Sequence, residues 1–145
     1  MSLKFDLFKI LIGDENDRDY KNKPVIIQGM TGSFGSTHTK LMKDYGTNIV
    51  AGVTPGKGGQ SFDGIPVFNT VAEAVQNNSV EISGIFVPAP FFLNAAKEAI
   101  DNGIKLLVAV PEHVPIIDSI KILEYAQKRG ARMIGPNTPG VIVPE

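Results

Sequence analysis

Glycines recur at every third position in the segment Gly29-Met-Thr-Gly-Ser-Phe-Gly35, with hydroxyl side chains at Thr31 and Ser33. A β-rich run at 25–28 precedes this segment, and a stretch with helical apolar spacing follows it. A turn from strand into helix leaves backbone N–H groups and the positive end of the helix dipole facing an anion. The residues therefore predict a phosphate-binding loop. Its G-x-x-G-x-x-G spacing differs from the commonest dinucleotide loop, G-x-G-x-x-G, so the loop alone does not define the ligand.

A lysine set among glycines marks the second candidate loop, Thr54-Pro-Gly-Lys-Gly-Gly59. A nicotinamide dinucleotide site normally has an acid near this point, at the end of the second strand, to hold the ribose hydroxyls. No acid stands here, and Lys57 would instead attract a phosphate on the ribose, such as the 3′-phosphate of coenzyme A. The alternative is a solvated lysine in a flexible turn. A Walker P-loop is excluded, because no hydroxyl residue follows Lys57.

Three further loops rich in glycine and proline follow predicted strands, at 88–90, 111–113 and 135–140. The joins that follow predicted helices are plainer turns. Because ligands of open α/β sheets bind outside the carboxyl ends of the strands, this asymmetry predicts one ligand crevice on that rim. The alternative is that the loops are ordinary chain reversals.

Alternating β-rich and helix-patterned segments position these loops. Strands are expected at 25–28, 49–53, 65–68, 82–87, 105–110 and 131–134, and helices at 33–45, 70–77, 91–102 and from Pro115 onward. The first helix has an apolar stripe of Phe34, His38, Leu41, Met42 and Tyr45, and the last carries Ile116, Ile120 and Leu123. Thr70 and Glu73 have capping-box spacing. Gly46, Gly103 and Gly130 stand where left-handed helix stops are expected.

These repeated units predict an α/β fold of the Rossmann-like class, with a mostly parallel sheet covered by helices on both faces in three layers. Residues 1–19 form an expected N-terminal arm, whose apolar cluster at 4–12 would pack on the domain or on a partner. Residues 20–145 form one domain, a size at which a single core is sufficient.

Composition narrows the possible functions. The 145 residues include no cysteine, carry a net charge of −1 and are 43% hydrophobic. We therefore expect no thiolate chemistry, no metal site, no nucleic-acid partner and no membrane span. His38 and His113 are too far apart to suggest a metal ligand pair. A cytoplasmic location is expected.

From about Tyr20 to its end, the chain resembles the N-terminal, CoA-binding domain of the α subunit of succinyl-CoA synthetase (succinate–CoA ligase, NDP-forming). The resemblance is carried by several motifs together, which are far more specific than any one glycine loop. They are Gln28-Gly-Met-Thr-Gly-Ser-Phe-Gly35, Tyr45-Gly-Thr47, Gly52-Val-Thr-Pro-Gly-Lys-Gly-Gly59 with Pro66-Val-Phe-Asn-Thr70, Val87-Pro-Ala-Pro-Phe91, and Met133-Ile-Gly-Pro-Asn137 continuing to Pro139-Gly-Val141.

The resemblance implies which residues hold coenzyme A. The phosphates would lie on the glycine loop, the ribose phosphate on Lys57, the adenosine side along 88–90, and a further part of the cofactor along 110–112. The implied cofactor-binding residues are Gly29, Thr31, Gly32, Ser33, Phe34, Gly35, Lys57, Pro88, Ala89, Pro90, Val110, Pro111 and Glu112. Where the family usually has Thr-Glu-Gly, this chain has Pro111-Glu112-His113, and the proline removes a backbone donor.

The resemblance also implies that catalysis lies outside this chain. In the family, a second domain of the α subunit carries the histidine that becomes phosphorylated, and a separate β subunit binds the nucleotide. His38 is expected to be packed and hydrogen-bonded, and His113 is not expected to be the phosphorylated residue. The implied function is presentation of CoA to an acyl phosphate formed elsewhere in the enzyme.

Three alternatives stay open at this point. The first is the equivalent domain of an ADP-forming acetyl-CoA synthetase or a malate–CoA ligase, which would share the fold and cofactor. The second is a non-catalytic module that senses CoA or NAD. The third is half of a nicotinamide dehydrogenase, which the missing acid after the second strand disfavours.

Overall fold

A computed structural model describes residues 10–11 and 22–143, which form a seven-stranded sheet in the order β3-β4-β2-β1-β5-β6-β7. The strands are β1 (Val25–Gln28), β2 (Ile49–Val53), β3 (Ser61–Phe62), β4 (Ile65–Phe68), β5 (Ile82–Ile85), β6 (Leu106–Ala109) and β7 (Arg132–Ile134). All neighbouring pairs are parallel except β3 with β4. The two-residue β3 is the one strand among these that the sequence patterns did not predict.

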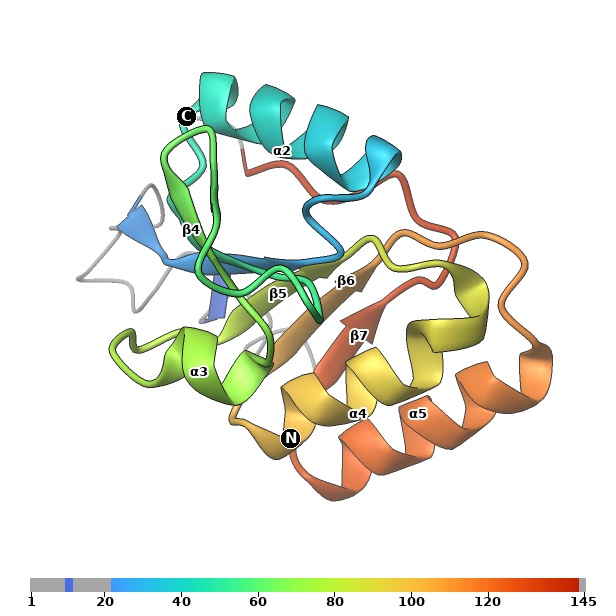
Figure 1. Cartoon of the computed structure of the whole chain (residues 1–145). Helices are drawn as coiled ribbons and strands as arrows, with labels where there is room; N and C mark the ends of the chain where they lie inside the picture. Colours follow the sequence, from blue (N-terminus) through green and yellow to red (C-terminus); the bar gives the residue numbers. More distant parts are fainter. Residues whose placement is uncertain (1–9, 12–21, 144–145) are drawn as a thin grey trace.

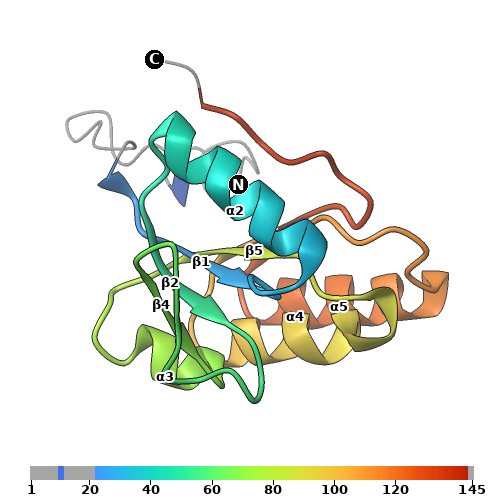
Figure 2. The ribbon, with the colours of Figure 1, turned by 45° about the horizontal axis from the view of Figure 1, so that its top comes forward.

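Helices cover both faces of the sheet, as Figures 1 and 2 show. They are α2 (Ser33–Tyr45), α3 (Val71–Val75), the 3-10 helix η2 (Ala89–Phe91), α4 (Phe92–Asp101) and α5 (Ile116–Lys128). The long helix α2 lies on one face, and α3, α4 and α5 lie on the other. Right-handed crossovers require this division, because the chain moves outward from β1 to β2 and in the opposite direction from β4 through β7. The predicted Rossmann-like fold is confirmed.

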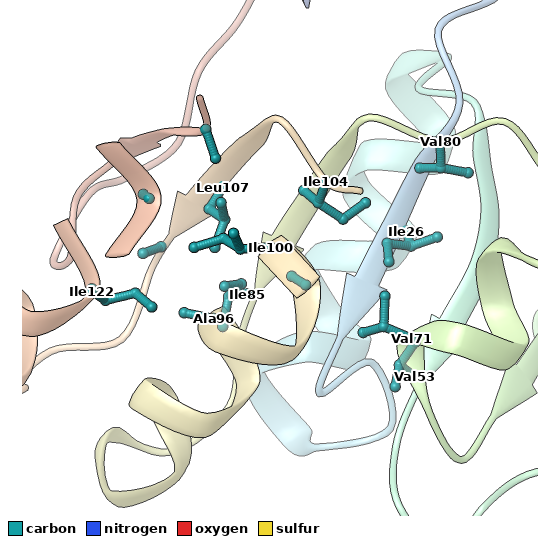
Figure 3. Close-up of a cluster of buried hydrophobic side chains, with 14 of the residues drawn as sticks. Ile26, Val53, Val71, Val80, Ile85, Ala96, Ile100, Ile104, Leu107 and Ile122 are labelled. Atoms are coloured by element: carbon teal, nitrogen blue, oxygen red, sulfur yellow. The ribbon is translucent and has the colours of Figure 1, made fainter. Parts of the chain in front are cut away.

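The larger hydrophobic core lies between the sheet and α3, α4 and α5. Phe92, Ala96, Ala99 and Ile100 are the buried face of α4. Figure 3 shows this layer, with side chains of β1, β2, β5 and β6 meeting those of the helices, among them Ile26, Val53, Val71, Ile85, Leu107 and Ile122. The small alanines of α4 allow the helix to approach the strands closely, which makes the sheet a rigid support for the loops at its edge.

The first helix packs on the opposite face of the sheet in a way that corrects the sequence prediction. Its buried residues are Gly35 and Thr39, whereas Phe34, Leu41 and Tyr45 are 54%, 59% and 61% exposed. Thr39 can be buried because its hydroxyl donates to the carbonyl oxygen of Gly35 at 2.7 Å. Of the predicted apolar stripe, Met42 packs against the core on this face, whereas the three exposed residues do not, because small residues allow closer contact between helix and sheet than large ones.

The last helix shows the same deviation. Ile122 and Ala126 of α5 are buried, while Ile116, Ile120 and Leu123 are exposed. The helix stops were predicted correctly, since Gly46, Gly103 and Gly130 all have positive φ, at 103°, 88° and 71°. These left-handed residues end α2, α4 and α5 in the positions that glycine favours.

The expected N-terminal arm lies outside the described residues except at Ile10 and Leu11. These two residues are helical and pack against the core cluster on the α2 face of the sheet, which contains Val25, Ile27, Met30, Ile65, Val67, Ile82, Leu106 and Val108. No helix among the described residues has the length and apolar character needed to span a membrane.

Candidate functional site

The glycine loop joins β1 to α2 at the centre of the sheet. Gly29 has a φ of +82°, and a β-carbon there would lie 2.9 Å from the carbonyl carbon of Phe86, so only glycine fits. Gly32 caps α2 with an extended backbone and no side-chain hydrogen bond, and the first turn of the helix contains no acid. The N–H groups of that turn are therefore left for an anion, which is the arrangement that binds phosphates.

An open cleft of about 1250 Å³ begins at this loop and follows the carboxyl ends of the strands. Its walls come from the loops after β1, β2, β5, β6 and β7, which is the rim on which the sequence predicted a ligand crevice. The lining residues are Gln28, Gly29, Thr31–Gly35, His38, Val53–Pro55, Phe86–Ala89, Phe91, Asn94, Ala95, Glu98, Val110–Glu112 and Asn137–Pro139.

Most of the expected cofactor-binding residues meet in this cleft. The structure brings together Gly29, Thr31, Gly32, Ser33, Phe34, Gly35, Pro88, Ala89, Val110, Pro111 and Glu112. Lys57 and Pro90 are not part of the lining. Lys57 is exposed two residues beyond Pro55, which lies on the cleft wall. It is thus placed to reach a ligand that extends out of the cleft after β2.

The loop that carries Lys57 is held by specific hydrogen bonds. Asn69 Oδ1 accepts the N–H groups of both Gly56 and Gly58 at 2.9 Å. The Lys57 N–H donates to the carbonyl oxygen of Thr54 at 3.0 Å, and Gly59 N–H donates to that of Val67 at 3.0 Å. The alternative of a lysine in a flexible turn does not match these bonds, because both peptide groups that flank Lys57 are fixed. Within residues 22–143, no carboxylate is within ion-pair distance of its ammonium.

The cleft itself is poor in positive charge. Among the described residues that line it there is no lysine or arginine, and the two acids are Glu98 and Glu112. Glu98 Oε1 accepts the N–H of Val71, at the start of α3, at 2.7 Å. Backbone N–H groups must therefore supply most of the attraction for an anion in the cleft. Three lysines stand within two residues of a lining residue along the chain, namely Lys40, Lys57 and Lys97.

One wall of the cleft is aromatic. The rings of Phe34 and His38 have centroids 4.3 Å apart, and His38 is stacked on Phe86 at 5.5 Å with an interplanar angle of 25°. His38 is packed as expected, but within residues 22–143 its imidazole makes no hydrogen bond, so that part of the prediction is wrong. In the part of the chain that the structure describes, no carboxylate forms an ion pair or hydrogen bond with the ring to orient it.

His113 lies on the rim rather than in the cleft. Its Nε2 is 3.8 Å from Glu112 Oε2, and the two side chains are 92% and 70% exposed. The φ of His113 is 60°, in the left-handed region that favours glycine. A glycine would adopt this conformation without the steric cost that a histidine carries. No group of three or more potential metal ligands occurs among the described residues.

Sequence patterns missed several residues of the cleft wall. Asn137 and Thr138 line it after β7, and their N–H groups donate to the carbonyl oxygens of Pro111 and Ala109 at 3.0 and 3.4 Å. Gln28 lines it from β1, where its amide bridges Ser83 and the carbonyl oxygen of Ala95 at 2.7 and 2.8 Å. The Gly-Pro-rich loop at 135–140 was a usable signal for the first pair. A glutamine within an apolar strand was the signal for Gln28.

A parallel sheet with a glycine loop after its central strand and a cleft along the carboxyl ends of its strands defines a nucleotide-binding domain of the Rossmann class. The family model described as "CoA binding domain" matches residues 20–113. The match covers more than half of the chain, and this chain belongs to that family.

One relative lies close in sequence. The chain is 52% identical over 122 residues to the α subunit of succinate–CoA ligase [ADP-forming] from Staphylococcus aureus strain Mu50, an alignment that covers 84% of this chain and 40% of the relative. The chain thus spans well under half the length of this relative.

Solved structures share the fold. An acetyl-coenzyme A synthetase from Ca. Korarchaeum cryptofilum superposes with a TM-score of 0.73 at 17% identity, covering 91% of this chain and 28% of that one. An ATP citrate lyase from Methanothrix soehngenii, solved with citrate and coenzyme A, has a TM-score of 0.65 at 19% identity and covers 81% and 21%. At these identities the likeness concerns the fold alone.

Proposed function

We propose that this domain holds coenzyme A for acyl transfer in a succinate–CoA ligase, as part of the α subunit. The observation that carries the proposal is the juxtaposition of an uncapped glycine loop at 29–35 with a clamped Lys57 loop at the edge of the same cleft. The first is suited to the diphosphate of CoA, and the second to the 3′-phosphate on its ribose. The identity of 52% to a ligase α subunit supports the choice of enzyme.

In this proposal the residues of the chain bind and orient CoA, and none is catalytic. The CoA thiol sulfur attacks the carbonyl carbon of an acyl phosphate formed elsewhere in the enzyme. The C–S bond forms, the C–O bond to the phosphoryl group breaks, the thiol proton passes to solvent, and inorganic phosphate leaves. The remainder of the α subunit and a nucleotide-binding β subunit are the proposed partners. The cytoplasmic location stays a prediction, as do the individual cofactor contacts.

Calorimetry on the 145-residue chain with CoA, dephospho-CoA and NADH tests the proposal. CoA should bind more tightly than dephospho-CoA, by about tenfold if the 3′-phosphate makes one charge-assisted contact with Lys57. Lys57→Ala should remove that preference, whereas Lys121→Ala, a change at an exposed lysine of α5, should not. Equal binding of the two CoA forms would contradict the proposal, and tight NADH binding without CoA binding would favour a dehydrogenase half.

The acetyl-CoA synthetase alternative differs only in what the rest of the enzyme does. Such an enzyme shares this fold at 17% identity, which leaves the sequence relation to the succinate enzyme as the stronger support. Assay of the complete α subunit with its partner, using succinate, acetate and malate in turn, decides among the acids.

A further inference from the structure

We infer that Asn69 is a positioning residue that sets the preference of this domain for CoA over dephospho-CoA, by fixing the loop that presents Lys57. The inference rests on the proposed function and deepens it. Asn69 Oδ1 accepts hydrogen bonds from the backbone N–H groups of Gly56 and Gly58, both at 2.9 Å. These two residues stand immediately before and after Lys57, so one side-chain oxygen accepts a backbone N–H from the residue on each side of the lysine.

Backbone hydrogen bonds hold both Lys57 and the base of the loop. The Lys57 N–H donates to the carbonyl oxygen of Thr54 at 3.0 Å, and the Lys57 carbonyl oxygen accepts the Gln60 N–H at 3.3 Å. Thr54 N–H donates to the carbonyl oxygen of Phe68 at 2.9 Å, and Gly59 N–H donates to that of Val67 at 3.0 Å, which anchors the two ends on β4. Between them, Gly56 has a φ of +82°, and glycines lose more conformational freedom on ordering than any other residue. Asn69 adds to these backbone bonds a side-chain acceptor for Gly56 and Gly58, the two glycines next to Lys57.

Glycine at position 58 fits the same interpretation. A β-carbon there would collide with the side-chain amide of Asn69, 2.8 Å from Oδ1. Its φ is not in the left-handed region, so backbone conformation does not require glycine. A side chain at position 58 would therefore displace the Asn69 amide from the loop.

Asn69 is itself fixed by the start of α3. Its own N–H donates to Glu73 Oε2 at 3.1 Å, while the Glu73 N–H donates to Thr70 Oγ1 at 3.2 Å. The second bond is one half of the predicted capping box, and the Glu73 carboxylate binds the N–H of Asn69 in place of that of Thr70. Glu98 of α4 holds the first N–H of that helix from across the interface. A continuous set of hydrogen bonds therefore joins the rigid α4 to the Lys57 loop.

A residue that acts only through Lys57 should change only the contribution that the 3′-phosphate makes to the binding affinity of CoA. We therefore expect Asn69→Ala to lower CoA affinity by about tenfold, as loss of the Lys57 contact would, and to leave dephospho-CoA affinity nearly unchanged. In a Lys57→Ala background, Asn69→Ala should have little further effect on either ligand. Asn78→Ala is the matched control, because it removes the same side chain from the other end of α3, where Nδ2 donates to the Ala74 carbonyl oxygen at 3.2 Å.

Calorimetry with both ligands on these variants, alongside thermal unfolding, gives distinct outcomes. Retention of the CoA preference in a folded Asn69→Ala chain overturns the inference and leaves the proposed function intact. Equal losses for both ligands also overturn it, because they indicate a general structural role. If Asn69→Ala does not fold, Gly58→Ala displaces the Asn69 side chain without removing it and must abolish the preference. Equal binding of CoA and dephospho-CoA by the unsubstituted chain overturns the proposed function and this inference together.

Discussion

Gly35 lies against the carbonyl group of Gly29, so closely that a β-carbon at position 35 would overlap the carbonyl oxygen and lie 3.0 Å from the carbonyl carbon. The contact joins the first turn of α2 to the end of β1. It brings the start of the helix directly above the strand and turns the free N–H groups of the helix toward the cleft. Gly29 and Gly35 thus lie at the two ends of the loop, and their close contact gives the loop the shape of an anion site.

Gly35→Ala should therefore disrupt the loop. Overpacking against rigid backbone costs about 1–3 kcal/mol or more, so we expect a lower unfolding free energy in urea together with loss of CoA binding. Gly32→Ala is the matched control, because its β-carbon would make an ordinary 3.5 Å contact with the Gly29 carbonyl oxygen. That variant should keep its stability and lose CoA affinity through the added methyl group on the exposed side of the loop. Equal stability of the two variants would contradict the role assigned to Gly35.

Local signals predicted the elements that position the site. The strand-to-helix turn at 29–35, the cap at Thr70 and Glu73, and the left-handed stop at Gly46 each depend on a few neighbouring residues, and the structure has all three. The crevice was predictable because parallel strands place their carboxyl ends on one rim. The order of the elements along the chain and the residue types at the turns were therefore sufficient to predict these elements and the position of the crevice.

Contacts between distant residues were not predictable in the same way. The clamp of Asn69 on Gly56 and Gly58 joins loops 11 to 13 residues apart, and no spacing rule identifies it. The burial of Thr39 in place of Leu41 depends on how closely α2 approaches the sheet, which the helical pattern does not encode. Both the Asn69 clamp and the burial of Thr39 depend on how elements far apart in the chain pack together.

His113→Gly should be neutral or stabilising. A histidine in the left-handed region carries a steric cost of about 1–2 kcal/mol that glycine lacks, although glycine also increases the freedom of the unfolded chain. We expect an unfolding free energy equal to or up to about 1 kcal/mol above that of the unsubstituted protein. His38→Gly is the comparison, since it removes a ring stacked on Phe86 from a helix and should destabilise the protein. Clear destabilisation by His113→Gly in chemical unfolding would refute the argument from φ.

The pairing of α4 with α5 should weaken in acid through Asp101. The hydroxyl of Tyr125 donates to Asp101, and with Lys97 and Arg129 nearby this lowers the pKa of the carboxyl below its usual value. A lowered pKa stabilises the fold at pH values above the ordinary pKa of Asp, about 3.9, and this stabilisation is lost as the pH falls through the folded-state value.

Urea unfolding of the protein and of Asp101→Asn at a series of pH values checks this. The difference in unfolding free energy should favour the unsubstituted protein near pH 6 and decline below about pH 4. Tyr125→Phe, which keeps the ring under Arg129 but removes the donor, should shift that decline to higher pH. A difference that stays constant down to pH 2 would exclude Asp101 as the titrating group.

Pro111→Thr should strengthen CoA binding, because it restores a backbone N–H on the cleft wall. Pro111 lines the cleft and cannot donate, whereas its carbonyl oxygen accepts the Asn137 N–H at 3.0 Å and so keeps the loop in place without the ring. One added donor to a charged ligand group can raise affinity by about tenfold.

The unfolding free energy of the Pro111→Thr variant should fall by about 0.4–1 kcal/mol, since the unfolded chain gains conformational freedom. Pro115→Thr, at the start of α5 and outside the cleft lining, should show no gain in affinity, and calorimetry with CoA on both variants measures the difference. If Pro111→Thr and Pro115→Thr bind CoA equally, the N–H at position 111 does not face the ligand, and the contact implied for this segment must come from Val110 or Glu112 instead.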